Sequence, residues 1–185
     1  MGSMKSEIVL SKFLEQRVSS FNVTSYRGFF AGVVERVSAD QLIRNGLFPQ
    51  IRAALDVFGV LIFKEMSLTN SEQLFIAKNL GFGIHRKTGI STISGNRYED
   101  EALTDVSNLD DKGEILSVRD RKRQYGLSNR LWHTDASFRD PPGRYSILSA
   151  KIVPKGEGET EFANTREAYY ALPVSMRDKI LGLEA

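Results

Sequence analysis

The motif His133-Thr134-Asp135 contains the residues of this sequence that are best suited to metal chemistry. In an extended chain, an imidazole and a carboxylate two residues apart point to the same side, with Cα atoms roughly 7 Å apart, so both can reach one ion. They would supply two ligands of a 2-His-1-carboxylate site, which leaves part of an octahedral Fe(II) open. The only other histidine is His85, and no histidine follows Asp135.

A His-x-Asp motif alone is weak evidence, because it also arises by chance at surface turns. Its surroundings add specific matches in a fixed order: Leu131-Trp132 before the motif, then Ser137-Phe138, Pro141-Pro142, residues 144–150, Pro154, residues 158–162 and Arg166-x-x-Tyr169-x-x-Leu172-Pro173. Fainter matches lie upstream, in residues 59–63 and 77–81. With these residues the chain resembles the taurine / 2,4-dichlorophenoxyacetate dioxygenase family of Fe(II)- and 2-oxoglutarate-dependent oxygenases.

The resemblance implies how the metal and the cosubstrate are held. His133 and Asp135 bind Fe(II) as the catalytic pair. Thr160 helps to hold the distal carboxylate of 2-oxoglutarate, since this sequence has Gly158-Glu159-Thr160 where the family has Gly-Asp-Thr. A hydroxyl that donates to a carboxylate makes a strong, charge-assisted hydrogen bond. An ordinary strand threonine remains the alternative for Thr160.

The resemblance also implies three substrate-contacting residues, His85, Asn129 and Ala136. A loop histidine without a role is an equally good account of His85, and Asn129 is similarly balanced. The carboxylate at Asp135 favours hydroxylation over halogenation, because related halogenases have a small residue there.

The function that follows from the resemblance is a dioxygenase that hydroxylates a small organic, anionic substrate with release of succinate and CO2. Its partners are the substrate, 2-oxoglutarate and dioxygen. The alternative is a non-catalytic jelly-roll binding or scaffold protein that has lost its second metal histidine. Substrate identity does not follow from the sequence.

Composition limits the remaining possibilities. The 185 residues are 41% hydrophobic and 26% charged, which is typical of a soluble globular domain. A net charge of +2 favours neither a nucleic-acid nor a membrane partner, and the absence of cysteine excludes disulfides. We expect a cytoplasmic protein, compatible with a homo-oligomer, in which residues 1–20 are a cloning scar and tail and residues 21–185 are one domain.

Hydrophobic periodicity and caps predict the first half of this domain. We expect strands at residues 27–34 and 60–63, the second fully buried, and helices at residues 39–45, 49–58 and 69–80. The last helix begins with a capping box formed by Thr69 and Glu72. Residues 81–128 are loop-rich and lid-like, with short strands at residues 103–109 and 115–118 and a solvated basic run at residues 119–123.

The second half is expected to return to strands, beginning at Asn129 and again at residues 145–153 and 160–163, followed by helices at residues 164–172 and 173–183. Trp132 and Phe138 are expected to be core residues beside the metal strand. These elements predict an α+β fold with an antiparallel sheet, and the resemblance implies a double-stranded β-helix (jelly-roll) core. We therefore expect this chain to be the front part of a dioxygenase whose polypeptide continues past Ala185 and supplies one more histidine and an arginine.

Overall fold

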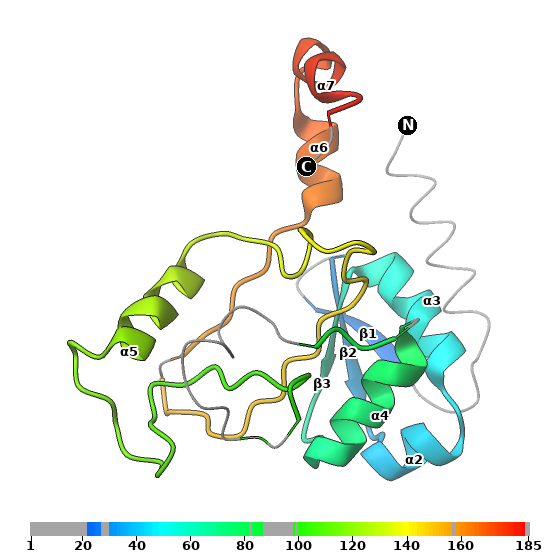
Figure 1. Cartoon of the computed structure of the whole chain (residues 1–185). Coiled ribbons are helices and arrows are strands. Elements are labelled where there is room, and N and C mark those ends of the chain that lie inside the picture. The colour runs from blue at the N-terminus through cyan, green and yellow to red at the C-terminus, as the bar shows by residue number, and fades with distance from the viewer. Residues whose placement is uncertain are drawn as a thin grey trace. The chain divides into compact units, whose positions relative to one another are not determined.

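The computed structural model describes residues 22–26, 30–81, 83–86, 98, 100–156 and 158–183. The chain divides into two compact units. Unit 1 comprises Met1–Ser67 and Ser149–Ala185, and unit 2 comprises Leu68–Leu148. Figure 1 traces both units and labels their helices and strands. The expected tail of residues 1–20 lies outside the described residues.

Unit 1 contains a three-stranded sheet in the order β1-β2-β3. Its strands are β1 (Asn22–Tyr26), β2 (Ala31–Glu35) and β3 (Val60–Phe63). β1 is antiparallel to β2, whereas β2 is parallel to β3. The sheet is therefore mixed and not purely antiparallel as expected, because the helices between β2 and β3 return the chain in the same direction. β1 was not predicted, although its five residues include the strand-favouring Val23, Thr24 and Tyr26.

Two helices join β2 to β3. Helix α2 (Ala39–Arg44) begins with a capping box between Ser38 and Gln41, and α3 (Phe48–Phe58) has a proline in its first turn. α3 contacts both β2 and β3 (Figure 1). The buried core of unit 1 consists of Val23, Val33, Val34, Val37, Ala39, Leu42, Leu47, Ile51, Ala54 and Phe58. β3 itself is half-buried along its whole length, so the fully buried strand predicted there is wrong.

Gly32 lies where the central strand approaches its neighbours most closely. A Cβ atom at this position would lie 2.6 Å from Cγ1 of Val23, 2.9 Å from Cδ2 of Leu61 and 3.0 Å from Cδ2 of Phe58. Real Cβ atoms do not tolerate such distances in a close-packed interior. Glycine is therefore required here by packing.

Unit 2 begins with α4 (Asn70–Leu80), whose predicted capping box between Thr69 and Glu72 is present. The buried hydrophobic residues in the described part of unit 2 are Ile76 and Leu80 in α4 and Leu103 in the following loop. The strands predicted at residues 103–109 and 115–118 are not formed. A single bridge between Leu109 and Ile115 is the only strand-like pairing in these segments.

A short helix, α5 (Arg121–Gly126), occupies part of the segment that was expected to be loop. The Asp120 side chain caps it by accepting a hydrogen bond from the Lys122 backbone. The 3-10 helix η2 (Leu127–Arg130) follows directly. Asn129 therefore lies in a helical turn and does not begin the strand that was predicted there.

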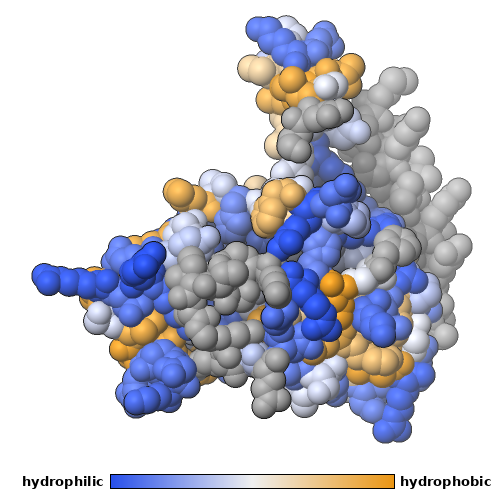
Figure 2. All heavy atoms as spheres, viewed as in Figure 1, coloured by the Kyte–Doolittle hydropathy of each residue, from blue (hydrophilic) through white to orange (hydrophobic). Residues whose placement is uncertain are grey.

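Unit 1 ends with α6 (Thr165–Ala171), capped by Asn164, and α7 (Val174–Ile180), which follows Pro173 and stops short of the predicted end at residue 183. Neither helix has a buried residue. Large side chains are accordingly exposed on both helices, among them Tyr170 in α6 and Val174 in α7. Figure 2 shows hydrophobic residues on the surface of the molecule.

The strands predicted at residues 145–153 and 160–163 are absent. Ile152 and Val153 are 78% and 75% exposed, where an internal strand would bury them. A strand needs a hydrogen-bonded neighbour, and the described residues place none beside these segments. None of the helices in the described part of the chain is long and apolar enough to cross a membrane.

Candidate metal centre

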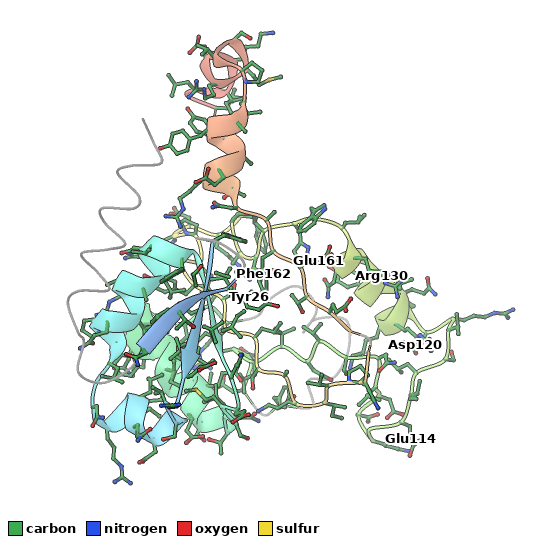
Figure 3. The ribbon with its side chains drawn as sticks, turned by 180° about the vertical axis from the view of Figure 1, so that it is seen from behind. Tyr26, Glu114, Asp120, Arg130, Glu161 and Phe162 are labelled. Carbon is green, nitrogen blue, oxygen red and sulfur yellow. The ribbon has the colours of Figure 1, made fainter. Side chains whose placement is uncertain are left out.

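The segment that carries His133 emerges from the end of η2. The Leu131 backbone N–H donates to the Ser128 carbonyl oxygen at 3.0 Å and closes the last turn. The backbone of Leu131 then becomes extended, with ψ at 144°. Figure 3 labels Asp120 and Arg130, which mark the two ends of this α5–η2 element. The motif thus lies just after the α5–η2 segment, whose first turn is capped by Asp120.

The imidazole of His133 is oriented by the backbone two residues before it. Its Nδ1 lies 2.7 Å from the Leu131 carbonyl oxygen. A carbonyl oxygen can only accept, so Nδ1 carries the proton, and in the neutral ring Nε2 keeps its lone pair. Metal-binding histidines are commonly held by a backbone carbonyl in this way. This partner could not be predicted from the sequence, because every residue has a backbone carbonyl.

The free nitrogen of His133 faces Asp135. Nε2 lies 3.5 Å from Oδ1 of Asp135, and the two side chains are 49% and 62% exposed. Two ligand atoms about 2.1 Å from one ion and at right angles to each other lie about 3 Å apart, so this spacing fits a shared ion with a small adjustment. Two lone-pair donors that face one another are stabilised by a cation between them, either a metal ion or a proton.

The loop after Asp135 folds back tightly. Ala136 has a positive φ of 51°, and its carbonyl oxygen accepts from the N–H groups of Arg139 at 3.3 Å and Gly143 at 3.1 Å. Left-handed backbone is unfavourable for a residue with a side chain and is concentrated at functional sites. A Cβ on Gly143 would lie only 3.0 Å from that of Ala136, so position 143 has little room for a side chain.

The other predicted site residues do not join this pair as metal ligands. Among the described residues, no group of three or more His, Cys, Asp and Glu side chains is arranged to hold an ion. His85 is partly buried in unit 2, and its Nδ1 has no hydrogen-bond partner among the described residues. Asn129 lies in η2, and Thr160 is exposed in unit 1, outside any strand.

Two expectations about the surroundings of the motif are wrong. Trp132 and Phe138 are 68% and 73% exposed and are not core residues. The described part of unit 2 provides no sheet for them to pack against. The basic run at residues 119–123 is not wholly solvated either, because the Lys122 side chain is only 10% exposed and pairs with Asp105.

Comparison with known proteins adds the family. A model described as "Taurine catabolism dioxygenase TauD, TfdA family" matches residues 25–185. The chain belongs to this family. The family expected from the motif is thereby confirmed, and its members are dioxygenases that use Fe(II) and 2-oxoglutarate.

Individual relatives of the TauD/TfdA family agree with this assignment. An alpha-ketoglutarate-dependent 2,4-dichlorophenoxyacetate dioxygenase from Cupriavidus pinatubonensis is 33% identical over 158 residues, which cover 84% of this chain and 54% of that protein. An (S)-phenoxypropionate/alpha-ketoglutarate-dioxygenase from Sphingobium herbicidovorans is 26% identical, with coverage of 90% and 53%. The chain thus spans about half the length of these curated relatives.

A solved structure supports the fold. The crystal structure of AAD-2 in complex with Mn(II) and N-oxalylglycine matches with a TM-score of 0.71 and 32% identity, over 87% of this chain and 53% of that one. The chain therefore has the fold of the matching part of that TauD-like protein.

Proposed function

We propose that this chain forms the metal-binding front part of an Fe(II)- and 2-oxoglutarate-dependent dioxygenase that hydroxylates a small anionic substrate. The observation that carries the proposal is the pair of His133 and Asp135, whose Nε2 and Oδ1 atoms are 3.5 Å apart and accessible. The hydrogen bond between Nδ1 and the Leu131 carbonyl leaves Nε2 free to bind a cation. Bound Fe(II) would supply the oxidation of 2-oxoglutarate and substrate by dioxygen, with succinate and CO2 as products.

The residues of this chain would bind and orient the reactants. Asp135 supplies a carboxylate ligand and so favours hydroxylation over halogenation. Thr160 is exposed, and its hydroxyl would donate a hydrogen bond to the distal carboxylate of 2-oxoglutarate.

We assign the substrate side of the site to His85, Asn129 and Ala136. The unpartnered Nδ1 of His85 can donate or accept a hydrogen bond. The tight backbone at Ala136 keeps a small side chain next to the ligand Asp135. An anionic substrate is suggested by the relatives, since those named above act on a phenoxyacetate and a phenoxypropionate, and another is named a sulfate ester dioxygenase.

The fold proposal is a jelly-roll core, of which residues 21–185 are the front part. It is supported by the apolar side chains that residues 145–153 expose, such as Leu148 and Ile152. Neighbouring strands would bury these side chains and turn the segment into the strand that its sequence predicts.

Metal binding by this chain tests the proposed function. Trp132 is the only tryptophan and directly precedes His133, so paramagnetic Mn(II) bound at the motif should quench its fluorescence. His133→Ala and Asp135→Ala should each weaken the Mn(II) affinity by about a hundredfold, because each variant removes one of the two ligands that the motif supplies. His85→Ala should leave the affinity unchanged, since the described residues do not place it in a metal group with the pair.

The alternative scaffold function makes the opposite prediction. A protein that has lost its metal site should show no saturable Mn(II) quenching. Binding that survives both His133→Ala and Asp135→Ala would also contradict the proposed centre, because the ion would then lie elsewhere.

A further inference from the structure

Lys122 is the only lysine of the basic run at residues 119–123, and its side chain is largely shielded from solvent. Its Nζ donates to the Leu109 carbonyl oxygen at 2.9 Å and lies 3.3 Å from Oδ2 of Asp105. The side chains of Lys122 and Asp105 are 10% and 9% exposed. A buried cation and carboxylate persist only where they are paired and hydrogen-bonded, so this contact fixes the distance between α5 and the preceding loop.

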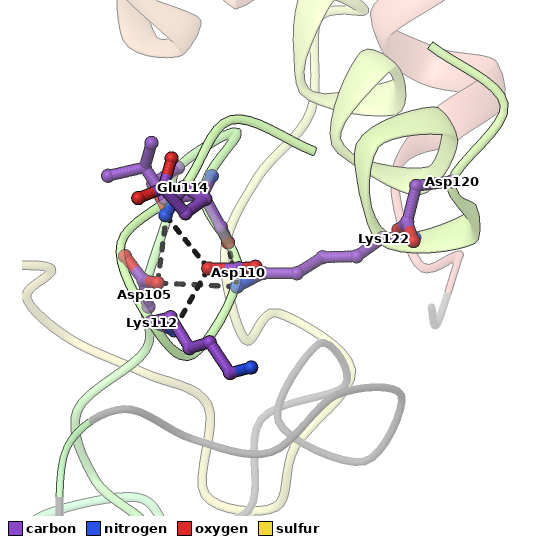
Figure 4. Close-up of polar contacts among 8 residues, drawn as sticks. Asp105, Asp110, Lys112, Glu114, Asp120 and Lys122 are labelled. Atoms are coloured by element: carbon purple, nitrogen blue, oxygen red, sulfur yellow. Dashed lines mark hydrogen bonds and ion pairs between the residues drawn. The ribbon is translucent and has the colours of Figure 1, made fainter. Parts of the chain in front are cut away.

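The loop side of the contact is itself ordered by hydrogen bonds. Oδ2 of Asp105 accepts from the Ser107 hydroxyl at 3.0 Å, and the Leu109 N–H donates to the same hydroxyl at 3.3 Å. Figure 4 shows Asp105 and Lys122 beside the turn that carries Asp110 and Glu114. The pair therefore joins α5 to a loop with a defined shape.

A second basic side chain strengthens the same junction. Nη1 of Arg123 donates to the Leu116 carbonyl oxygen at 2.7 Å, and the Gln124 side-chain amide donates to the Val118 carbonyl oxygen. Successive residues of α5 are thus bonded to the loop that precedes the helix. α5 cannot turn or shift without breaking several of these bonds.

The opposite end of α5 leads to the metal-binding histidine through a short series of hydrogen bonds. The Ser128 hydroxyl donates to the Tyr125 carbonyl at 2.7 Å and ties η2 to α5. The Leu131 N–H donates to the Ser128 carbonyl at 3.0 Å, and the Leu131 carbonyl then holds Nδ1 of His133 at 2.7 Å. The orientation of the imidazole thus depends on the position of α5.

We infer that Lys122 and Asp105 are positioning residues for the metal site, which hold α5 so that the Leu131 carbonyl keeps the Nε2 lone pair of His133 directed at the ion. The inference rests on the proposed function, because it assigns these residues to the support of that site. Partners that fix the tautomer and direction of a ligating histidine alter metal affinity by about ten- to a hundredfold when they are removed. Lys122 acts through α5 and touches no reactant.

The test compares Lys122→Met with Arg121→Met in the full chain. Met keeps most of the length of the lysine stem and removes its charge, while Arg121 is exposed on the same first turn of α5 and serves as the matched control. Lys122→Met should weaken Mn(II) binding, measured by Trp132 quenching, by about tenfold. Arg121→Met should leave it unchanged.

Two measurements without metal separate positioning from general stability. Nitrogen NMR of the His133 ring should show a smaller fraction of the Nδ1-protonated tautomer in Lys122→Met, and the Leu131 amide should exchange its hydrogen faster. Far-UV circular dichroism should stay unchanged. If Lys122→Met does not fold, Asp105→Asn keeps the side-chain shape, removes only the charge and should change the same measurements in the same direction.

The outcomes distinguish the two claims. A wild-type chain that binds no Mn(II) contradicts the proposed function, and the tautomer and exchange measurements still decide the positioning role. Wild-type binding with an unchanged tautomer and unchanged Leu131 exchange in Lys122→Met overturns the inference and leaves the proposed function intact. Equal loss of affinity in Arg121→Met also overturns it.

Discussion

Arg166 in α6 donates from Nη1 to the backbone carbonyl oxygen of Asp56 in α3, 2.9 Å away and 110 residues earlier in the sequence. The carbonyl of Asp56 is one of the last four of α3, which have no partner within the helix. A cation is also favourable at this negative end of the helix dipole. Arg166 therefore fixes the start of α6 to the end of α3. This contact is a structural role for the arginine that begins the motif Arg166-x-x-Tyr169-x-x-Leu172-Pro173.

Arg166→Met should release α6 from this contact. The hydrogen bond is exposed, so its loss should cost about 1 kcal/mol, less than a fully buried bond from a charged donor. Amide hydrogens of α6 should therefore exchange about fivefold faster, while those of α3 change little. Lys179→Met in α7, where the lysine is exposed, is the control, and equal acceleration in both variants would contradict the anchoring role.

Gly32→Ala should destabilise the sheet of unit 1. The added methyl would lie 2.6 Å from Cγ1 of Val23, which belongs to the adjacent strand and cannot move aside easily. Overpacking of this kind costs about 1–3 kcal/mol, which urea denaturation would measure. Gly126→Ala is the matched control, because nothing lies within 4 Å of an added Cβ there and its φ is not positive. A stability of Gly32→Ala equal to that of Gly126→Ala would show that the strands separate at little cost.

The elements that the sequence predicted correctly are those with local signals. Ser38, Thr69 and Asn164 each cap a helix by bonding backbone N–H groups two or three residues ahead, so the information lies within one turn of chain. β3 was found because four consecutive apolar residues follow a helix end. α5 was missed because its charged sequence has no apolar period, although Asp120 at its N-cap was a usable signal.

The strands predicted after Asn129 failed for the opposite reason. Residues 145–153 have the composition of an internal strand. A strand forms only when a second segment pairs with it through backbone hydrogen bonds, and no strand among the described residues pairs with this segment. In the candidate site, too, some contacts follow from local sequence and others from the fold. The two-residue spacing of His133 and Asp135 predicted neighbouring side chains, and their Nε2 and Oδ1 atoms lie 3.5 Å apart. The contact of His133 with the Leu131 carbonyl and the pair of Lys122 and Asp105 depend on how the chain folds back.

Asp110 should make the turn at residues 110–114 sensitive to acid. Hydrogen bonds lower the pKa of this carboxyl below its ordinary value; the largest cause is the Glu114 N–H, at 2.8 Å, and the Lys112 N–H adds a bond at 2.9 Å (Figure 4). A carboxyl whose pKa is lower in the folded than in the unfolded chain stabilises the fold above its unfolded pKa. That stabilisation is lost as the pH falls through the folded pKa.

Asp110→Asn removes the charge and keeps an oxygen acceptor. The stability difference between wild type and Asp110→Asn should be largest near neutral pH and should shrink toward zero below the pKa of the folded carboxyl. Urea midpoints measured from neutral to strongly acid pH would follow this difference. Asp111→Asn, at the exposed neighbouring position, is the control variant for the loss of one carboxylate from this turn. A stability difference for Asp110→Asn that grows in acid would contradict the predicted direction.

Thr160→Val should weaken binding of 2-oxoglutarate and not of the substrate, if Thr160 has the role that we propose. Valine has a similar shape and lacks the hydroxyl, so the change removes one hydrogen bond to a carboxylate. Such a bond is worth about 1.5–3 kcal/mol, which corresponds to roughly a ten- to hundredfold loss of affinity. Titration of the Mn(II)-loaded protein with 2-oxoglutarate measures it, and Thr165→Val, at an exposed threonine at the start of α6, is the matched control. Unchanged 2-oxoglutarate affinity together with weakened substrate binding would move Thr160 to the substrate side of the site.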